Sequence, residues 1–489
     1  MKKHLLIVIL AIALLVRVIH LASLWNTPIL DVPIIDSEYY HNWAAKLISD
    51  EATDGGVFFM SPLYPYLVSF FYSIFGVSLK FIAVVQVLLG LGVITLIYFI
   101  GKRIFGDQAA LLSAFIAAVY MPFLYYESLL LSAIVILLLN GGALLCLMAE
   151  KHKNLLSFVA GVLAGLSALA RPNALLFTVI LVVAFLLLPQ LGGRKRGVLV
   201  FIGVLLVLLP VTYRNYRTSG DWVLITANAG MNFYAGNNPQ AEGIYWEAPF
   251  VRSAEPQYEN LDYRREASLR VGRELDLQAS SRYWFHQGFQ FIIHQPLSYL
   301  KLLLKKFFLF FHDTEIPNNL SIYSVRIFSS LLKYLPFTFG WVAPLGIAWW
   351  FLRKRGETKE QKGRRIILDI YVLSYFTSTL IFFAASEYRL PILLVVIPFT
   401  ADAAVSLLNG SWKMDWKPKL RLLLIAALLA ISVNLPTGFT RTLRSPKMDY
   451  FNLGSVLLKQ SRFAEAAPLL QQSLIYDPYF SEAHCALGD

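Results

Sequence analysis

Residues 81–100 read FIAVVQVLLGLGVITLIYFI, twenty residues without a charge. A helix of this length and composition spans the hydrocarbon core of a membrane. Similar stretches recur along the chain, which is 57% hydrophobic and only 15% charged. Open strand edges are excluded from lipid and no alternating barrel pattern appears, so the spans are predicted to be helical. We therefore predict an all-α polytopic membrane protein.

About eleven spans fit the apolar stretches. They are 5–24, 80–100, 107–121, 129–148, 155–170, 174–189, 198–213, 334–352, 366–384, 391–408 and 420–436. Almost half of the 43 Lys and Arg residues fall in connections on one side, whereas residues 25–79 contain one, Lys46, beside six acids. The positive-inside rule then places the N-terminus in the cytoplasm. The net charge of +12 reflects this topology rather than binding to nucleic acid.

Two outer loops, 25–79 and 214–333, interrupt a membrane domain predicted to cover residues 1–440. Within them, the stretches 61–76 and 296–313 are predicted to form interfacial helices, because apolar residues alternate with Pro or Lys.

Residues 447–489 change character and follow the 34-residue tetratricopeptide pattern. Its large and small positions are Tyr450, Leu453, Gly454, Leu457, Ala466, Leu470, Ser473 and Pro478. One such repeat cannot bury its own face. We expect either that the sequence is truncated and further repeats follow, or that this repeat docks on another surface. The preceding span directs it to the outer side.

The first outer loop opens with acids, in DVPIIDSEYYHNWA at residues 31–44. Asp36 and Glu38 would share a side on extended chain but point apart on a helix. One interpretation is structural, with Asp36 as a helix N-cap and Glu38 as a first-turn acid. The other is functional, because a carboxylate can act as a general base.

Further charged residues are predicted at the same membrane face. Glu127 lies on the second outer turn, and Arg171 lies where a proline breaks the segment 155–189. SEYRLP at 386–391 brings Tyr388 and Arg389 to the outer end of a span. Each charged residue also has a structural interpretation. Glu127 could be an exposed acid, Arg171 an arginine that snorkels to the interface, and Arg389 an anchor that flanks the span or a partner of Glu387.

Together these groups suggest a reaction. Carboxylates can activate an acceptor or bind a divalent cation, and arginines bind phosphate by a bidentate fork. A lipid-linked sugar phosphate at the outer leaflet would meet both. We predict glycosyl transfer from a polyprenyl-phosphate sugar to a glycan, lipid or protein acceptor.

The order of several motifs resembles bacterial GT-C superfamily glycosyltransferases, which include protein O-mannosyltransferases and aminoarabinose transferases. The motifs are DSEYYHNWA, PLYP, GKRIFG, ALARPNALL, RNYRTSGDW, GMNFYAGNNP and YRLPI. The resemblance covers about residues 1–440 and implies an inverting transfer. It implies that Asp36 is the base or a metal-linked acid, with Glu38 beside it.

The resemblance also implies the remaining site residues. Candidate substrate contacts are Glu127, Arg171, Arg389, Tyr388 and His41, with the two arginines on the phosphate. Asp36 and Glu127 would be the ligands of a divalent cation, Mg or Mn, if one is used. A lone His beside an acid is more often structural, and that reading of His41 stays open.

Two other functions remain open. A transporter or flippase of lipid-linked sugars would be expected to repeat its halves, and no second copy of DSEYY or ARPN occurs. A membrane scaffold that presents tetratricopeptide repeats, and recruits a protein partner through them, would not need polar groups near the outer face.

Overall fold

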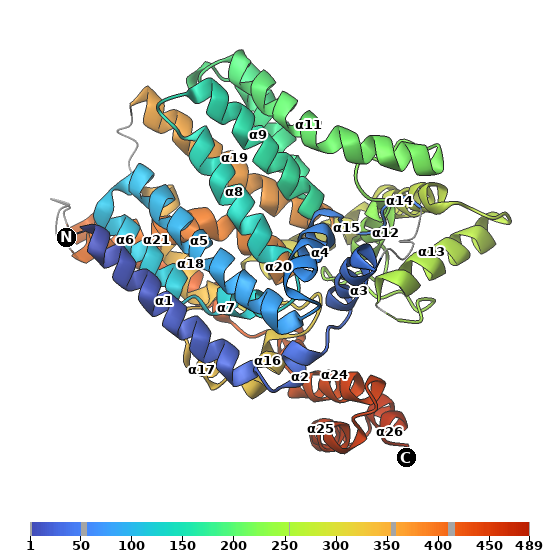
Figure 1. The fold of residues 1–489 in the computed structure, drawn as a ribbon. Helices are drawn as coiled ribbons and strands as arrows, with labels where there is room; N and C mark the ends of the chain where they lie inside the picture. The colour runs from blue at the N-terminus through green and yellow to red at the C-terminus, as the bar shows by residue number, and fades with distance from the viewer. Residues whose placement is uncertain (1, 50–55, 254, 354–357, 409–415, 489) are drawn as a thin grey trace.

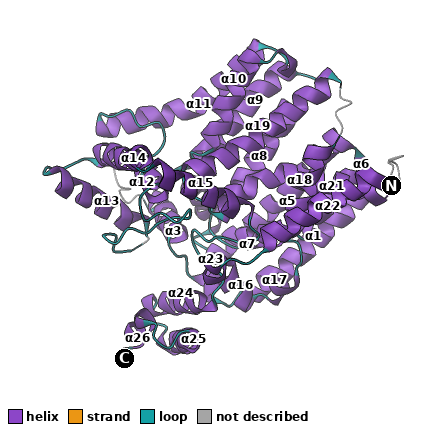
Figure 2. Ribbon diagram, turned by 180° about the vertical axis from the view of Figure 1, so that it is seen from behind, coloured by secondary structure: helices purple, strands orange, loops and turns teal. Residues whose placement is uncertain are grey.

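The computed structural model describes residues 2–49, 56–253, 255–353, 358–408 and 416–488. Every regular element in these ranges is a helix (Figure 2). The predicted all-α class is therefore confirmed. In Figure 1, long helices form the body of the molecule, a layer of shorter helices lies at one end of them, and the C-terminal helices lie beneath that layer.

The long helices correspond to the predicted spans. They are α1 (Lys2–Leu24), α5 (Leu79–Phe105), α6 (Asp107–Ala118), α8 (Ala133–Leu147), α9 (Lys153–Ala170), α10 (Ala174–Leu187), α11 (Arg194–Ser219), α18 (Phe339–Leu352), α19 (Lys359–Ile381), α21 (Leu393–Leu408) and α22 (Trp416–Asn434). A short helix that was not predicted, α7 (Met121–Glu127), follows α6. Short 3-10 turns, η1 (Pro189–Leu191) and η2 (Leu390–Ile392), precede α11 and α21.

Among the described residues, five helices are long and apolar enough to cross a membrane, or up to seven if two bent pairs each form one span. The bent pairs are α6 with α7, and α22 with the helices that follow it. The chain is an integral membrane protein, while the count of about eleven spans stays a prediction.

Two groups of long helices pack side by side. One contains α8, α9, α10, α11 and α19, the other contains α1, α5, α6, α18, α21 and α22, and α5 packs against α8 between them. Glycines allow a close approach between α9 and α11. A Cβ atom on Gly161 would lie 2.1 Å from the carbonyl oxygen of Val200, and one on Gly203 would lie 2.4 Å from that of Phe158. Small residues at such contacts are how helices pack tightly in lipid.

The layer at the end of the long helices is built from the two predicted outer loops and the start of residues 386–392. Its helices are α2 (Pro28–Asp31), α3 (Asp36–Ile48), α4 (Leu63–Phe75), α12 (Ala229–Gly236), α13 (Pro256–Val271), α14 (Leu277–His294), α15 (Pro296–Phe311), α16 (Ile322–Phe328), α17 (Ser330–Tyr334) and α20 (Ser386–Arg389). Helices therefore form in both predicted interfacial stretches, as α4 and α15. On α15 the three lysines differ, because Lys301 is exposed and Lys305 is half-buried but Lys306 is fully buried.

The C-terminal part contains α23 (Gly438–Thr442), α24 (Pro446–Lys459), α25 (Phe463–Tyr476) and α26 (Ser481–Leu487). α24 and α25 form a hairpin, and α24 also packs against α16. Gly454 faces Leu470 so closely that a Cβ atom would lie 2.7 Å from its Cγ. The buried residues of the hairpin include Leu453, Leu457 and Ala466, which occupy the predicted repeat positions. The assignment to the tetratricopeptide class stays a prediction.

Candidate functional site

Asp36 is the first residue of α3, and the chain turns sharply just before it. The preceding residue, Ile35, has φ 52° and ψ −118°, a conformation that a β-branched residue rarely adopts and that costs about 1–3 kcal/mol. The N-cap position is occupied by Ile35, and no side chain caps the helix there. The interpretation of Asp36 as a helix cap is therefore wrong, and its carboxylate is available for another role.

Asn319, in the loop between α15 and α16, binds Asp36 by two hydrogen bonds. Its amide donates to Asp36 Oδ2 at 3.0 Å, and its carbonyl oxygen accepts from the Asp36 backbone N–H at 3.1 Å. Burial raises the pKa of the Asp36 carboxyl, while the Asn319 hydrogen bond and the positive charge of Arg171 oppose that rise. A raised pKa makes the carboxylate a stronger base than an exposed aspartate.

Arg171 lies near Asp36, in the turn between α9 and α10. Its guanidinium donates to the carboxylate of Glu387 and lies 4.9 Å from the ring centroid of Tyr388. The side chain keeps 18% of its surface exposed. Among the described residues, Glu387 is the one acceptor that bonds this guanidinium, so further N–H groups remain for a ligand. The structure thus brings Asp36, Arg171 and Tyr388 together.

Arg389, one residue further on, differs from Arg171. Its guanidinium donates to the carbonyl oxygens of Phe310 and His312 and pairs with Glu315 at 2.9 Å. It is only 3% exposed. These partners leave little capacity for a phosphate, so the structure favours a role for Arg389 in holding α15 and α20 together.

Glu127 also has a structural partner. It is buried at the end of α7, where Arg17 of α1 donates to Oε1 at 2.9 Å and its Nε lies 2.7 Å from Oε2. Arg17 donates in addition to the carbonyl oxygen of Ala118 at 2.9 Å. Both oxygens of the Glu127 carboxylate contact Arg17, so the group is buried in an ion pair and does not lie exposed at an outer turn.

Glu38 and His41 lie on α3 but face different partners from Asp36. Burial raises the pKa of Glu38, the nearby charge of Glu255 adds to the rise, and Lys459 opposes it. His41 Nδ1 lies 2.8 Å from the hydroxyl oxygen of Tyr72 on α4, and burial lowers its pKa. The helical start at Asp36 separates the three side chains, so the roles of Glu38 and His41 in substrate binding stay predictions.

The loop 312–320, HDTEIPNNL, connects the site to the rest of the molecule, and its importance was not predicted. Besides Asn319, it contributes Glu315, which pairs with Arg389, and Ile316, whose backbone N–H donates to the Ser386 hydroxyl at 2.7 Å. Nothing in the sequence marks this loop, because its partners lie far away along the chain.

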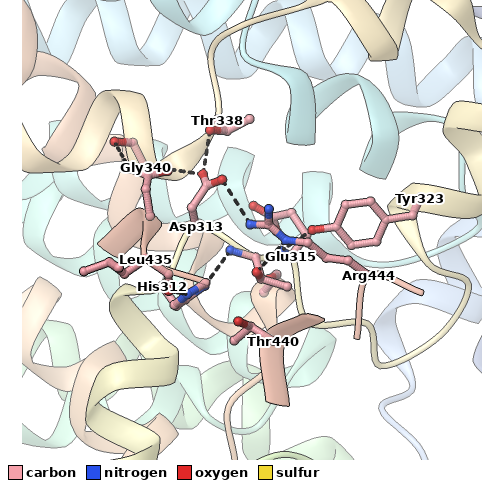
Figure 3. Close-up of polar contacts among 12 residues, drawn as sticks. His312, Asp313, Glu315, Tyr323, Thr338, Gly340, Leu435, Thr440 and Arg444 are labelled. Atoms are coloured by element: carbon pink, nitrogen blue, oxygen red, sulfur yellow. Dashed lines mark hydrogen bonds and ion pairs between the residues drawn. The ribbon is translucent and has the colours of Figure 1, made fainter. Parts of the chain in front are cut away.

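Figure 3 shows the other end of the loop, where Asp313 lies between three groups. Its Oδ1 accepts from Thr338 Oγ1 at 2.5 Å and from the Gly340 N–H at 2.7 Å, and its Oδ2 lies 3.5 Å from Arg444. His312 Nε2 lies 3.0 Å from the carbonyl oxygen of Leu435. Because Arg444 lies two residues before the start of α24, the same loop that holds Asp36 also contacts the segment that leads into the C-terminal hairpin.

A second carboxyl group, Glu259, was missed by the sequence analysis. It lies in the first turn of α13, is 8% exposed and accepts a hydrogen bond from Tyr245 Oη at 2.5 Å. Burial raises the pKa of Glu259 to about 8; the Tyr245 hydrogen bond opposes the rise, and the charge of Asp36 adds to it. α13 is polar on most sides and also buries Asp262, so no sequence pattern distinguishes Glu259.

The predicted divalent cation requires oxygen ligands from several side chains. Within the described ranges, no group of three or more His, Cys, Asp and Glu residues is placed to hold a metal. Glu127, one of the two predicted ligands, is bound by Arg17. The residues do not fit a cation at Asp36 and Glu127.

The family model described as dolichyl-phosphate-mannose-protein mannosyltransferase matches residues 60–213. This match agrees, over these residues, with the predicted resemblance to protein O-mannosyltransferases. The matched segment runs from the residues before α4 to α11 and includes Glu127 and Arg171. Asp36, Asn319, Glu259 and Tyr388 lie outside it, so their roles rest on the geometry above.

Solved structures with a similar arrangement have low sequence identity. An archaeal oligosaccharyltransferase, AglB from Archaeoglobus fulgidus in complex with an inhibitory peptide and a dolichol-phosphate, is similar over 89% of this chain and 57% of its own, with 16% identity and a TM-score of 0.46. ArnT from Cupriavidus metallidurans, bound to undecaprenyl phosphate, is similar over 99% of this chain and 77% of its own, with 12% identity and a TM-score of 0.49. The chain thus spans little more than half the length of AglB. No curated protein sequence matches the chain.

Proposed function

We propose that this protein transfers a sugar from a polyprenyl-phosphate donor to an acceptor at the extracytoplasmic face of a bacterial inner membrane, with its N-terminus in the cytoplasm. The observation that carries the proposal is the convergence of Asp36, held by Asn319, with the half-buried Arg171. The family match over residues 60–213 supports a glycosyltransferase. The relatives AglB and ArnT were solved with lipid phosphates, which agrees with the donor class.

In the proposed reaction, a hydroxyl or amine of the acceptor attacks the anomeric carbon of the sugar. The bond from that carbon to the phosphate oxygen breaks, and its electron pair leaves with the polyprenyl phosphate. Asp36 takes the proton of the attacking group, and Arg171 stabilises the departing phosphate through its free N–H groups. A single displacement of this kind inverts the anomeric configuration.

Tyr388 would orient Arg171 through its ring. Arg389 and Glu127 are assigned to structure rather than to substrate, because salt bridges occupy both. The C-terminal hairpin is proposed to recruit a protein acceptor or partner, as its predicted repeat class would allow.

The test uses the full chain in lipid nanodiscs with a panel of radiolabelled polyprenyl-phosphate sugars and a cell extract as the source of acceptors. Asp36→Asn should bind the donor at least as tightly, because it removes a negative charge near the phosphate, but should transfer nothing. Arg171→Lys keeps a charge for Glu387 but loses the fork, so donor affinity should fall about tenfold, roughly 1.4 kcal/mol. Arg217→Gln, an exposed residue at the end of α11, is the matched control. Full turnover by folded Asp36→Asn would exclude Asp36 as the base, and failure of every polyprenyl-phosphate sugar to bind would exclude the donor class.

A further inference from the structure

Glu259 and Asp36 lie on two helices that pack against each other, α13 and α3. Each carboxyl group is in the first turn of its helix. Glu259 is almost fully buried, and Asp36 is half-buried at the start of the neighbouring helix. The negative charge of Asp36 adds to the rise in the pKa of Glu259. Two carboxyl groups that interact in this way do not readily ionise together, because each negative charge disfavours the other.

The groups that interact electrostatically with Glu259 are acids and tyrosines. Within the described part of the chain, no Lys, Arg or His side chain forms an ion pair with it. The titratable groups that interact with it are Tyr245 and Glu247 from the preceding loop, Asp36 from α3, Tyr388 from α20 and Tyr263 from its own helix. One of them, Tyr245, donates a hydrogen bond to it.

Asp36 has different surroundings. Asn319 donates a hydrogen bond to its carboxylate, and the positive charge of Arg171 is close enough to favour its ionised form. Of the two groups, Asp36 is therefore the one that loses its proton first, and Glu259 is the one that keeps it. The pKa of about 8 for Glu259 agrees with this order.

We propose that Glu259 is a positioning residue for the transfer. It remains a neutral carboxylic acid beside ionised Asp36, so the two carboxyl groups together carry one negative charge rather than two before the donor binds. This inference rests on the proposed function. The incoming donor adds its own negative phosphate, and a second carboxylate would repel that phosphate. Donor affinity and kcat/KM should consequently fall as Glu259 ionises.

The experiment is a pH profile of kcat/KM on the full chain, for the wild type, Glu259→Gln and the control Glu274→Gln, an exposed acid just after the end of α13. The wild type should lose activity on the alkaline side, with a midpoint near the Glu259 pKa of about 8. Gln resembles the neutral acid, so Glu259→Gln should retain at least about a third of the activity at neutral pH, and its alkaline loss should move up by about one pH unit or more. Glu274→Gln should follow the wild type.

Two results would overturn the inference. One is an alkaline limb in Glu259→Gln that superimposes on that of the wild type. The other is a loss of about 100-fold or more at neutral pH in a folded variant, which would mean that the ionised form is required. If Glu259→Gln does not fold, Tyr245→Phe serves instead. The Tyr245 hydrogen bond lowers the Glu259 pKa, so its removal should move the alkaline limb to higher pH, and an unmoved limb would contradict the inference.

Infrared spectroscopy separates this inference from the proposed function. A protonated carboxyl group absorbs infrared light at a different frequency from a carboxylate. The wild type should therefore show a carboxylic acid band that disappears near pH 8 and is absent from Glu259→Gln. Presence of that band in a protein that transfers no sugar would leave the protonation of Glu259 standing and would refute the reaction. Absence of the band in an active enzyme would refute the role of Glu259 alone.

Discussion

Asn319 holds Asp36 at two points, donating to its carboxylate at 3.0 Å and accepting from its backbone N–H at 3.1 Å. The two residues are 283 positions apart. The first outer loop supplies the candidate base, and the loop 312–320 fixes its orientation. Because the same loop also binds Arg389 and Arg444, the position of Asp36 depends on contacts across the whole outer layer.

Replacing Asn319 by alanine should slow the transfer without unfolding the protein. A hydrogen bond to a charged group contributes about 1.5–3 kcal/mol, so kcat/KM should fall about 10- to 100-fold. The neighbouring Asn318, for which no side-chain hydrogen bond occurs among the described residues, provides the control Asn318→Ala. Equal rates for the two variants in a donor-turnover assay would show that Asn319 does not position the base.

The same variant should also shift the acid limb of the pH profile. The Asn319 hydrogen bond lowers the Asp36 pKa against the raising effect of burial. Its removal raises that pKa further, so the base becomes protonated at a higher pH and activity is lost earlier on acidification. A profile of kcat/KM between pH 4 and 8 measures the shift. A limb that stays in place, or moves to lower pH, would assign the titration to another group.

Much of the fold follows from the sequence, because the length of an apolar segment and the proline that ends a helix can both be read from neighbouring residues. The turn at 171–173 between α9 and α10 lies where Pro172 predicted it. The pairing of side chains was harder to predict. Arg171 and Tyr388 do meet near Asp36, but Glu127 is taken up by Arg17, and Arg389 by Glu315. A charge at an outer helix end has the same sequence signature whether it binds a ligand or a buried partner. Asn319 and Glu259 were missed for the same reason, because only tertiary contacts distinguish them from other loop and helix polar residues.

Gly90 on α5 should be intolerant of even a methyl group. A Cβ atom there would lie 2.1 Å from Glu127 Oε1 and 2.5 Å from its Cδ, and the carboxylate cannot move away because Arg17 holds it. Gly90→Ala should therefore destabilise the protein by about 1–3 kcal/mol through overpacking. Gly92→Ala is the control, since its Cβ would meet only the flexible end of Leu138, at 2.9 Å. Thermal unfolding in detergent compares the two, and equal midpoints would mean that the Arg17–Glu127 pair can shift.

Arg389 offers the sharpest contrast between a structural and a phosphate-binding arginine. In the structural role, Arg389→Met leaves Glu315 buried without its partner and should cost about 3–5 kcal/mol of stability. The double variant Arg389→Met with Glu315→Leu removes both charges and should recover most of that loss, with donor affinity in the folded protein close to the wild type. Unfolding midpoints and donor binding are measured on the same nanodisc samples. A stable single variant whose donor affinity is tenfold weaker would instead place Arg389 on the phosphate, because a residue needed only to neutralise Glu315 has no direct effect on the ligand.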